Sequence, residues 1–540
     1  MSTSAIPLVT FILVVIAIFT TINLKVTVPI PFTKKRFEVS YVYPPLLGVL
    51  FLWMLGQITL TDIVTGGIVG DKDIQPYSIV IIVLFSSMVC LSLDFTGALA
   101  FIAFKIVKTF AHTTRHLFAI TYWLCVSCSV MTSNDIVILT LTPVVMYCCR
   151  FAKLNPVPYL FAQFHAANLG SLFLLIGNPT NVIVGEAFGI GFAEYTKYMA
   201  FPAIVCAASG FIVLYLYYRK EIGSTPLILP DLNPIDYLRD RRGAVVHAII
   251  LAACLLMMGL SSFVSGLRLY MIAAGAGILS MVYNFTAYPL TRAALRAQQP
   301  PAETPGVHLD DATMRPARDV SGPPLEDLRL TADGLGSDAV RPPSNPAPTS
   351  DGAVDSSSDG AAAASEPVRE LCAQAIVEAL PWNLVPFVFG MFVLVQALLL
   401  SGWVGDLADL CVYLMGGQDS INGTSNPQFI ATFVMCVVTL LLCNLINNQP
   451  ATILLTRVLV SQPFRDLVLQ AQRGAMFGVI AASNFAALLT QLGALAGILF
   501  AGIVALGGYR VTYMQFLKHG LIVTPVVLVL TALAISIVLL

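Results

Sequence analysis

Two apolar segments of the chain carry amide, hydroxyl and carboxylate side chains at a shared spacing. Asn134 is followed eight residues later by Thr142, and Asn448 is followed eight residues later by Thr456. Amide groups both donate and accept hydrogen bonds, and the adjacent carboxylate of Asp135 can bind a proton or a cation. These residues therefore suit the binding of a polar solute together with a coupling ion.

The rest of the chain is too apolar for a soluble protein. Of its 540 residues, 57% are apolar and 11% are charged, whereas soluble domains have roughly 25% charged residues. So few charges cannot cover a water-facing surface, which excludes a soluble enzyme. The 29 basic and 30 acidic residues nearly balance, which gives no reason to expect a nucleic-acid partner. The sequence predicts an integral, multi-pass membrane protein that is not an enzyme.

Apolar stretches of the length of a membrane helix recur along the chain. A hydrocarbon core of about 30 Å needs ~20 helical residues. Eight stretches fit one crossing each: roughly 5–23, 43–60, 77–93, 200–218, 244–262, 269–286, 383–401 and 519–539. Four others are too long for one crossing and too short for two: 117–149, 158–188, 428–458 and 474–505. The pattern predicts an all-α polytopic protein with about 10–12 membrane segments.

Each of the four longer stretches has a polar cluster near its middle. Backbone groups in hydrocarbon must be paired within the protein, so such a cluster indicates a helix that is broken around a cavity. We expect 117–149 and 428–458 to enter and return as re-entrant hairpins, and 158–188 and 474–505 to cross once through a broken middle. The order of span, hairpin and broken helix occurs twice, which predicts two structural repeats.

The basic residues orient the first half of the chain. Fourteen Lys and Arg residues lie in the loops 24–42, 105–116, 150–156 and 219–243, and only three lie in the loops 61–77, 189–199 and 263–268. Basic residues stay on the cytoplasmic side, so the first hairpin should open to the cytoplasm and the second to the outside. The sequence therefore predicts inverted-topology repeats with the N-terminus outside.

A segment of different composition separates the two halves. Residues 297–370 hold 11 of the 32 prolines and 13 of the 30 acidic residues, and they cannot bury enough apolar surface to fold. We therefore expect a first transport repeat over 1–286, a disordered cytoplasmic linker over 287–370 and a second repeat over 371–540.

The predicted site lies where the two hairpin tips meet the two broken helices. Half-helix N-termini would there offer partial positive charge to a solute. The predicted solute-binding residues are Ser133, Asn134, Asn178, Thr180, Asn181, Asn447, Asn448, Thr452, Ser483, Asn484 and Thr490. Asp135 is the predicted ion-coupling residue, because a charge within a membrane helix is costly and usually functional. If Na⁺ is the coupling ion, we expect it near Asn134, Asn178, Asn448 and Asn484.

These residues also have structural interpretations. A single asparagine is as readily explained by capping a broken helix as by binding a solute, but the repeated set favours a solute site. His165 could relay protons, yet a neutral histidine bonded across helices is the preferred interpretation. The thiols of Cys125 and Cys128 would suit trivalent arsenic or antimony. A cysteine pair in an apolar helix is usually packing, so we leave this pair out of the site.

The motifs resemble those of an ion transporter superfamily that includes arsenical pump membrane subunits, citrate and dicarboxylate transporters and sodium/proton antiporters. SNDIVILTLTP resembles its Asn-Asp hairpin, IGNPTNVIVG its Gly-Asn-Pro-x-Asn break, and INNQPATILL its second hairpin. Arsenical-pump-like members usually read Thr-Pro-Ile-Gly in the last broken helix, where this chain reads Thr490-Gln491-Leu492-Gly493. This departure leaves the identity of the solute open, but it does not change the fold that the motifs predict.

The resemblance implies a secondary transporter of a small inorganic anion or oxyacid, coupled to H⁺ or Na⁺ and needing no other cofactor. Arsenite or antimonite efflux by proton exchange is the leading candidate, citrate or dicarboxylate transport the second, and Na⁺/H⁺ exchange the third. A channel or a non-transporting scaffold is the alternative from a different class. No Walker-type motif is visible, so an ATPase subunit is not required. We favour the plasma membrane over an internal one, and the resemblance suggests a homodimer.

Overall fold

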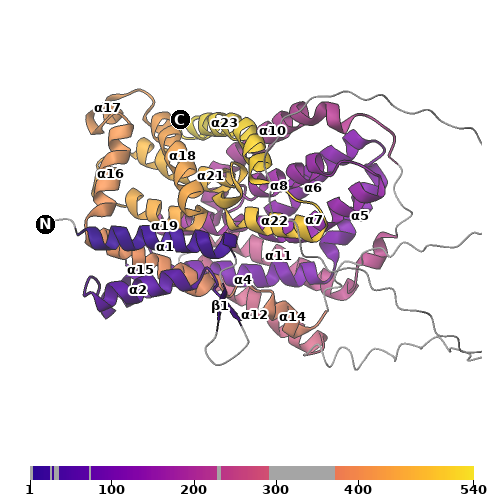
Figure 1. The fold of residues 1–540 in the computed structure, drawn as a ribbon, viewed down its shortest axis with the longest axis horizontal. Coiled ribbons are helices and arrows are strands. Elements are labelled where there is room, and N and C mark those ends of the chain that lie inside the picture. Colours follow the sequence, from indigo (N-terminus) through magenta and orange to yellow (C-terminus); the bar gives the residue numbers. More distant parts are fainter. Residues whose placement is uncertain are drawn as a thin grey trace, which may run out of the picture. The chain divides into compact units, whose positions relative to one another are not determined.

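Helices make up nearly all of the described part of the chain (Figure 1). The structure, a computed structural model, describes residues 4–24, 27–29, 36–71, 74–227, 233–264, 266–290 and 371–540. Its contacts divide the chain into one unit of residues 1–296 and 369–540 and another of residues 297–368. Both predicted repeats therefore belong to the same unit. The core of the predicted linker, residues 297–370, lies outside the described residues.

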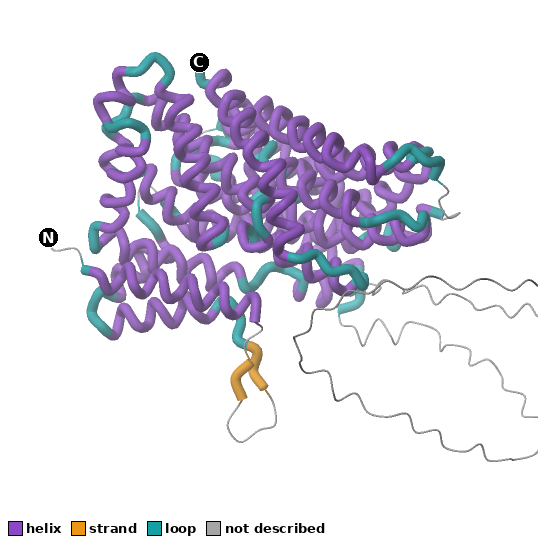
Figure 2. The backbone as a smooth tube through the Cα atoms, turned by 45° about the horizontal axis from the view of Figure 1, so that its top comes forward, coloured by secondary structure: helices purple, strands orange, loops and turns teal. Residues whose placement is uncertain are grey.

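The chain begins with α1 (Ala5–Leu24), which matches the first predicted span. A short antiparallel hairpin follows, formed by β1 (Thr27–Pro29) and β2 (Arg36–Glu38) and drawn in orange in Figure 2. This hairpin lies in a stretch that the sequence predicted to be a loop, and it is the one departure from an all-α fold among the described residues.

The predicted span 43–60 is instead divided between two short helical segments. These are α2 (Tyr43–Met54), then α3 (Leu60–Val64), which continues as the π-helix η1 (Thr65–Val69). With 12 residues, α2 is about 18 Å long, which is too short to cross a bilayer alone. Glycines let η1 approach α15 (Leu384–Leu400) closely, because a Cβ at Gly66 or Gly67 would overlap the side chain of Gln396 or Val393.

The first repeat contains the predicted span, hairpin and broken helix in order. Its helices are α4 (Pro76–Phe95), α5 (Ala98–Phe110), α6 (Thr114–Met131), α7 (Asn134–Phe151), α8 (Val157–Gly170), η2 (Leu175–Gly177), α9 (Pro179–Ala187) and α10 (Phe192–Ile222). After it come η3 (Pro234–Tyr237), α11 (Arg241–Ser261) and α12 (Leu269–Ala287).

The second repeat has the same order of elements. It begins with α14 (Ala373–Glu378), α15 and α16 (Trp403–Leu414), and continues with α17 (Gln418–Gly423), α18 (Pro427–Ile446), α19 (Asn448–Leu459), α20 (Gln462–Arg465), α21 (Leu469–Phe485), η4 (Ala486–Leu488), η5 (Gln491–Gly493), α22 (Leu495–Leu506) and α23 (Tyr513–Val538). A left-handed glycine precedes the second helix of each repeat: Gly97 has φ +82° before α5, and Gly402 has φ +90° before α16. Only glycine adopts this conformation readily, so both bends have a common backbone cause.

Seven of the described helices are long and apolar enough to cross a membrane, and the pair α15 and α16, bent by 80°, could supply an eighth span. They include α4, α10, α11, α12 and α23, which coincide with five predicted spans. The prediction of a polytopic α-helical membrane protein is confirmed, whereas the inverted orientation of the repeats stays a prediction.

Each repeat packs its hairpin against the broken helix of the other repeat. The second arm of the first hairpin, α7, packs on α22, and the second arm of the second hairpin, α19, packs on α9. The long helices α10 and α23, which follow the broken helices, also pack on each other (Figure 1). This exchange makes the two repeats one structural unit and brings all four breaks together.

Replacing residues 297–366 by a short Gly/Ser bridge should leave the transport fold intact. The backbone N–H groups of Ala373 and Gln374 donate to the carbonyls of Pro289 and Leu290, so the described residues on either side of the excised segment lie side by side. We expect the shortened protein to elute from a size-exclusion column in detergent as one species, with a melting temperature within about 3 °C of the full chain. Aggregation of the shortened protein would contradict this expectation.

Candidate functional site

All four predicted breaks are present. The first hairpin turns at Thr132 and Ser133 between α6 and α7. The second turns at Asn447, whose φ of +71° lies in the left-handed region between α18 and α19. The broken helices pass through η2 in the first repeat and through η4 and η5 in the second. The sequence correctly placed these breaks because a polar cluster cannot remain inside a continuous lipid-facing helix.

A cavity of about 320 Å³ lies where the four breaks meet. It is lined by the first hairpin tip, by Ile176 and Pro179 at the first broken helix, by Gln449 at the second hairpin tip and by Leu495 at the start of α22. One face of α4 and the short segment between α14 and α15 complete its wall. A water molecule takes about 30 Å³ of liquid, so the cavity has room for a small solute and several waters.

The carboxylate of Asp135 is the one acidic group that lines the cavity. Asp135 lies in the first turn of α7, where the helix dipole favours a negative charge. Tyr41, which precedes α2, lines the cavity as well. Burial, and secondly the charge of Asp135, raises the pKa of the Tyr41 phenol. The phenol therefore stays protonated and can donate a hydrogen bond.

The remaining polar groups of the cavity wall are uncharged. They are the hydroxyls of Ser86, Ser87, Thr132 and Ser133 and the amide of Gln449. Among the described residues that line the cavity there is no Lys, Arg or His side chain. The cavity thus offers hydroxyl donors and acceptors and a carboxylate, but no basic group to neutralise an anion.

The four half-helix N-termini differ in how they are capped. In α9 the side chain of Asn178 accepts a hydrogen bond from the backbone N–H of Thr180, and in α19 Asn447 accepts one from Gln449. In α7 and α22, the residues at the capping positions, Ser133 and Ala494, make no such bond. The two uncapped helices pack on each other, and both line the cavity. Their first-turn N–H groups remain available to a ligand.

Asn484 lies at the centre of a buried hydrogen-bond network between the repeats. Its Oδ1 accepts from Ser171 Oγ at 2.9 Å and from Asn178 Nδ2 at 3.0 Å, and its Nδ2 donates to Asn181 Oδ1 at 2.7 Å. Beside it, the hydroxyl of Ser483 donates to that of Thr180 at 3.0 Å. All of these side chains are buried. The predicted residues Asn178, Thr180, Asn181, Ser483 and Asn484 therefore connect the two broken helices and do not line the cavity.

The equivalent asparagines of the two hairpins occupy similar environments. Asn134 Nδ2 donates to Asn168 Oδ1 at 3.2 Å, and Asn448 Nδ2 donates to the carbonyl of Ser483 at 3.4 Å. The Oδ1 atoms of both asparagines are buried and have no hydrogen-bond partner among the described residues. Each of these asparagines thus joins its hairpin tip to the broken helix of its own repeat.

The other predicted residues also hold the breaks in place. Asn447 Nδ2 donates to the carbonyl of Leu492 at 3.2 Å, and the Thr490 hydroxyl donates to Asn444 Oδ1 at 2.6 Å. The Thr452 hydroxyl bonds the carbonyl of Asn448 one turn earlier. Of the predicted site residues, Ser133 and Asp135 line the cavity, and the rest support its walls.

Sequence reasoning missed several residues of the cavity and the network. Gln449 lies inside the quoted second-hairpin motif. Asn168 is the first-repeat equivalent of Asn484 when the two repeats are aligned at Pro179, where α9 begins, and Leu495, where α22 begins. Either could have been found by extending the repeat alignment. Tyr41 and the α4 serines lie outside every motif, so the sequence carries no signal for them.

Two structural interpretations can be compared with the geometry. His165 is buried, but its Nδ1 contacts the carbonyl of Phe161 in its own helix at 2.8 Å, so the predicted bond across helices is wrong.

Cys125 lines a separate void of about 10 Å³, beside Cys148 and Cys149. A space of that size holds about one water, which agrees with packing.

A family model described as "Citrate transporter" matches residues 5–288 and 352–472. A putative transporter arsB of Dictyostelium discoideum is 37% identical over 101 residues, 18% of each chain. An arsenical pump membrane protein of Escherichia coli is 26% identical over 246 residues, covering 44% of this chain and 55% of that one. Matches to these relatives thus span about half of their length or less.

The solved structures include the YdaH transporter of Alcanivorax borkumensis. It aligns with 99% of this chain and 96% of its own, at 13% identity and a TM-score of 0.48.

Replacing Asn484 by Ala should destabilise the fold. The change removes partners from Ser171, Asn178 and Asn181 at once, and each buried polar group left unpaired costs about 1–3 kcal/mol. We expect the melting temperature in detergent to fall by roughly 5 °C or more. Asn426→Ala, at an exposed position, is the matched control and should leave the melting temperature nearly unchanged. Equal melting temperatures for the two variants would refute the role of the network.

Proposed function

The chain belongs to the citrate transporter family of membrane transporters, and we propose that its solute is a small uncharged oxyacid, with arsenious acid as the leading candidate. The cavity between the four breaks is the proposed solute site. Asp135 is the proposed carrier of the coupling proton, and the solute leaves the cell in exchange for that proton.

The charge of the cavity wall is the observation that carries this proposal. Within the described part of the wall, Asp135 is accompanied by hydroxyl and amide groups and by no basic side chain. A multiply charged anion in this cavity would lose its hydration and face a carboxylate without a compensating cation, which is costly. A neutral acid avoids both costs. The relatives described as arsenical pump proteins support the same class of solute.

Hydroxyl groups of the solute match both kinds of group at the site. Arsenious acid carries three uncharged hydroxyls near neutral pH, and each can donate one hydrogen bond and accept others. A donated bond can reach the carboxylate of Asp135, while an oxygen of the solute accepts from the uncapped N–H groups of α7 or α22. The serine hydroxyls and the Tyr41 phenol can adapt to either role.

Competition at Asp135 provides a mechanism of exchange. In its ionised form the carboxylate accepts a hydrogen bond from the solute. Protonation turns the group into a donor and removes its charge, so the solute is held less firmly and can leave. Deprotonation on the other side restores the binding form. Proton and solute then occupy the site alternately, which is the requirement for antiport.

Sodium is the alternative coupling ion. The unpartnered Oδ1 atoms of Asn134 and Asn448 are neutral oxygen ligands at equivalent positions of the two hairpins. Together with freed backbone carbonyls they could hold a Na⁺ beside each tip, near Asn178 and Asn484 of the buried network. In that case transport of the solute would depend on a sodium gradient. Na⁺/H⁺ exchange would then be the activity that competes with solute transport.

Citrate transport is the second candidate, because the matching family is described by that solute. A citrate carrier would have to neutralise the trianion with groups that do not line the cavity in this conformation.

A solute screen in proteoliposomes separates these candidates. We expect saturable counterflow of arsenite, and accumulation when a proton gradient is imposed, because the neutral acid fits the charge of the cavity. Silicate, citrate, succinate and Na⁺ serve as comparison solutes. A channel would show no counterflow, and saturable citrate counterflow without arsenite counterflow would overturn the proposed solute.

Asp135→Asn should uncouple transport from the proton gradient. The amide keeps the shape and hydrogen-bonding capacity of the side chain but no longer titrates at physiological pH. We expect the variant to insert, to bind solute and to exchange it, whereas proton-driven accumulation should fall to a ratio of about one across the membrane. The measurement is the final solute ratio in proteoliposomes under a fixed pH gradient.

Asn448→Ala is the control for Asp135→Asn. It changes the residue equivalent to Asn134, the neighbour of Asp135, and removes no charge, so it should weaken exchange but leave the remaining transport coupled. Accumulation by Asp135→Asn that still follows the pH gradient would show that the carboxylate is a structural cap.

A further inference from the structure

Arg457 is the buried basic side chain of the described residues. Its exposed fraction is 2%, and it is the one buried Lys or Arg among the residues whose burial the structure describes. It lies in the second half of α19, at the position that Pro143 occupies in the first hairpin when Asn134 is aligned with Asn448. The second hairpin therefore has a cation where the first has a helix-bending proline.

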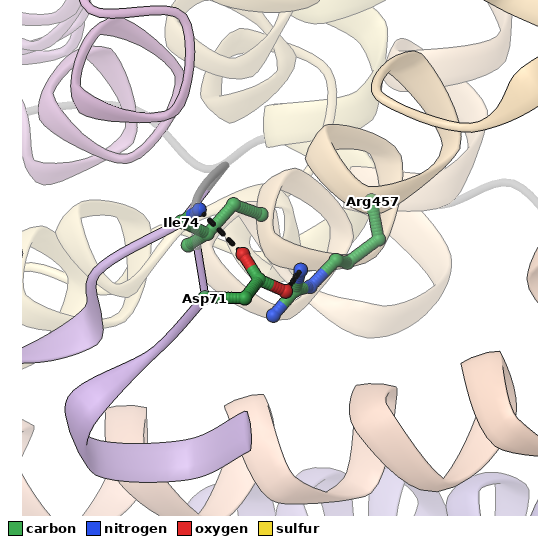
Figure 3. Close-up of polar contacts among 3 residues, drawn as sticks. All are labelled: Asp71, Ile74 and Arg457. Carbon is green, nitrogen blue, oxygen red and sulfur yellow. Dashed lines mark hydrogen bonds and ion pairs between the residues drawn. The ribbon is translucent and has the colours of Figure 1, made fainter. Parts of the chain in front are cut away.

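The guanidinium of Arg457 is paired on one side only. Its Nη1 lies 2.5 Å from Oδ2 of Asp71, which precedes α4 (Figure 3). Its Nε and Nη2 are buried without a hydrogen-bond partner among the described residues. The Asp71 side chain is 46% exposed. A cation removed from water is thus balanced by a carboxylate that remains half in water, and such a pair is only marginally favourable.

Two hydrogen bonds tie Asp71 to Ile74. The Asp71 N–H donates to the Ile74 carbonyl at 3.0 Å, and Asp71 Oδ1 accepts from the Ile74 N–H at 2.9 Å (Figure 3). Gly70 has φ +85°, and a Cβ there would overlap the Ile74 carbonyl, so the turn requires glycine. Two residues after Ile74, α4 begins. The position of Asp71 is therefore fixed relative to the start of α4.

The ion pair joins two walls of the cavity. Residues of α4 from Ile82 to Leu91 form one wall, and Gln449 at the start of α19 belongs to the other. The opposite end of α4 is held elsewhere, because the carbonyl of Thr96 accepts from the N–H groups of Arg239 and Asp240. A further wall comes from Ala379 and Pro381, which follow α14. The pair thus bridges α4 and α19 at the N-terminal end of α4.

We propose that Asp71 and Arg457 form a latch that closes the cavity on the Asp71 side. The latch holds α19 against the start of α4 in the present conformation. When the cavity opens to that side, the pair separates and water reaches the two nitrogen groups of Arg457 that are unpaired here. That hydration offsets the lost ion pair, so the latch can open without a large barrier. The proposal does not depend on which solute is carried.

Thiol labelling from each side of the membrane tests the latch. A reporter thiol is placed in the cavity by Leu499→Cys in a Cys90→Ala background, because Cys90 also lines the cavity. Membrane-impermeant maleimide is applied to right-side-out and inside-out vesicles. Asp71→Asn keeps the oxygen that bonds Ile74 and removes only the charge. We expect it to accelerate labelling about fivefold in one vesicle orientation and not in the other.

Asp71→Glu retains the carboxylate, so the reporter thiol should react with the maleimide at nearly the rate seen with the unmodified latch. Raising the salt concentration from about 0.1 to 1 M should also accelerate labelling in the same orientation, because it screens a half-exposed pair. This second measurement needs no substitution at the latch. The proposal would be overturned if Asp71→Asn did not change the labelling rate in either vesicle orientation. It would also be overturned if Asp71→Asn accelerated labelling equally in the two orientations.

Discussion

Backbone groups freed by a break inside hydrocarbon need partners from the protein, and asparagine side chains supply them here. Asn181 Nδ2 donates to the carbonyls of Ser171 and Leu174 in the first broken helix. Asn444 and Asn447 donate to the carbonyls of Ala486 and Leu492 in the second. Because Asn484 then joins Asn178 and Asn181, the two breaks stabilise each other. The two broken helices that border the cavity are held in position by this network.

The sequence predicts much of this fold because lipid imposes a strong constraint. A polar cluster within an apolar run of about thirty residues has few physical explanations, so a helix break was expected, and is present, in each of the four long stretches. The same reasoning was wrong for residues 43–60. Their composition fits a span, but α2 ends at Met54, which apolar content alone does not reveal.

Which side of a break each side chain faces could not be predicted. Asp135 lines the cavity while its neighbour Asn134 bonds Asn168, because successive residues of a helix point about 100° apart and the rotation of α7 is set by its packing. Ser483 and Asn484 likewise turn into the contact between repeats. Spacing along the chain locates a break, but the facing elements decide whether its residues bind solute or support the backbone.

Each repeat has one half-helix N-terminus with a side-chain cap and one without. Amide side chains close the N-termini of α9 and α19, whereas α7 and α22 begin without a side-chain cap at the cavity. A solute that occupies this position takes the role of the missing cap. A carboxylate could accept from these N–H groups but would be repelled by Asp135, which lies one turn or less away in α7. A neutral hydroxyl accepts from the N–H groups and donates to Asp135 in the same geometry, so the caps and the carboxylate together favour an oxyacid over an anion.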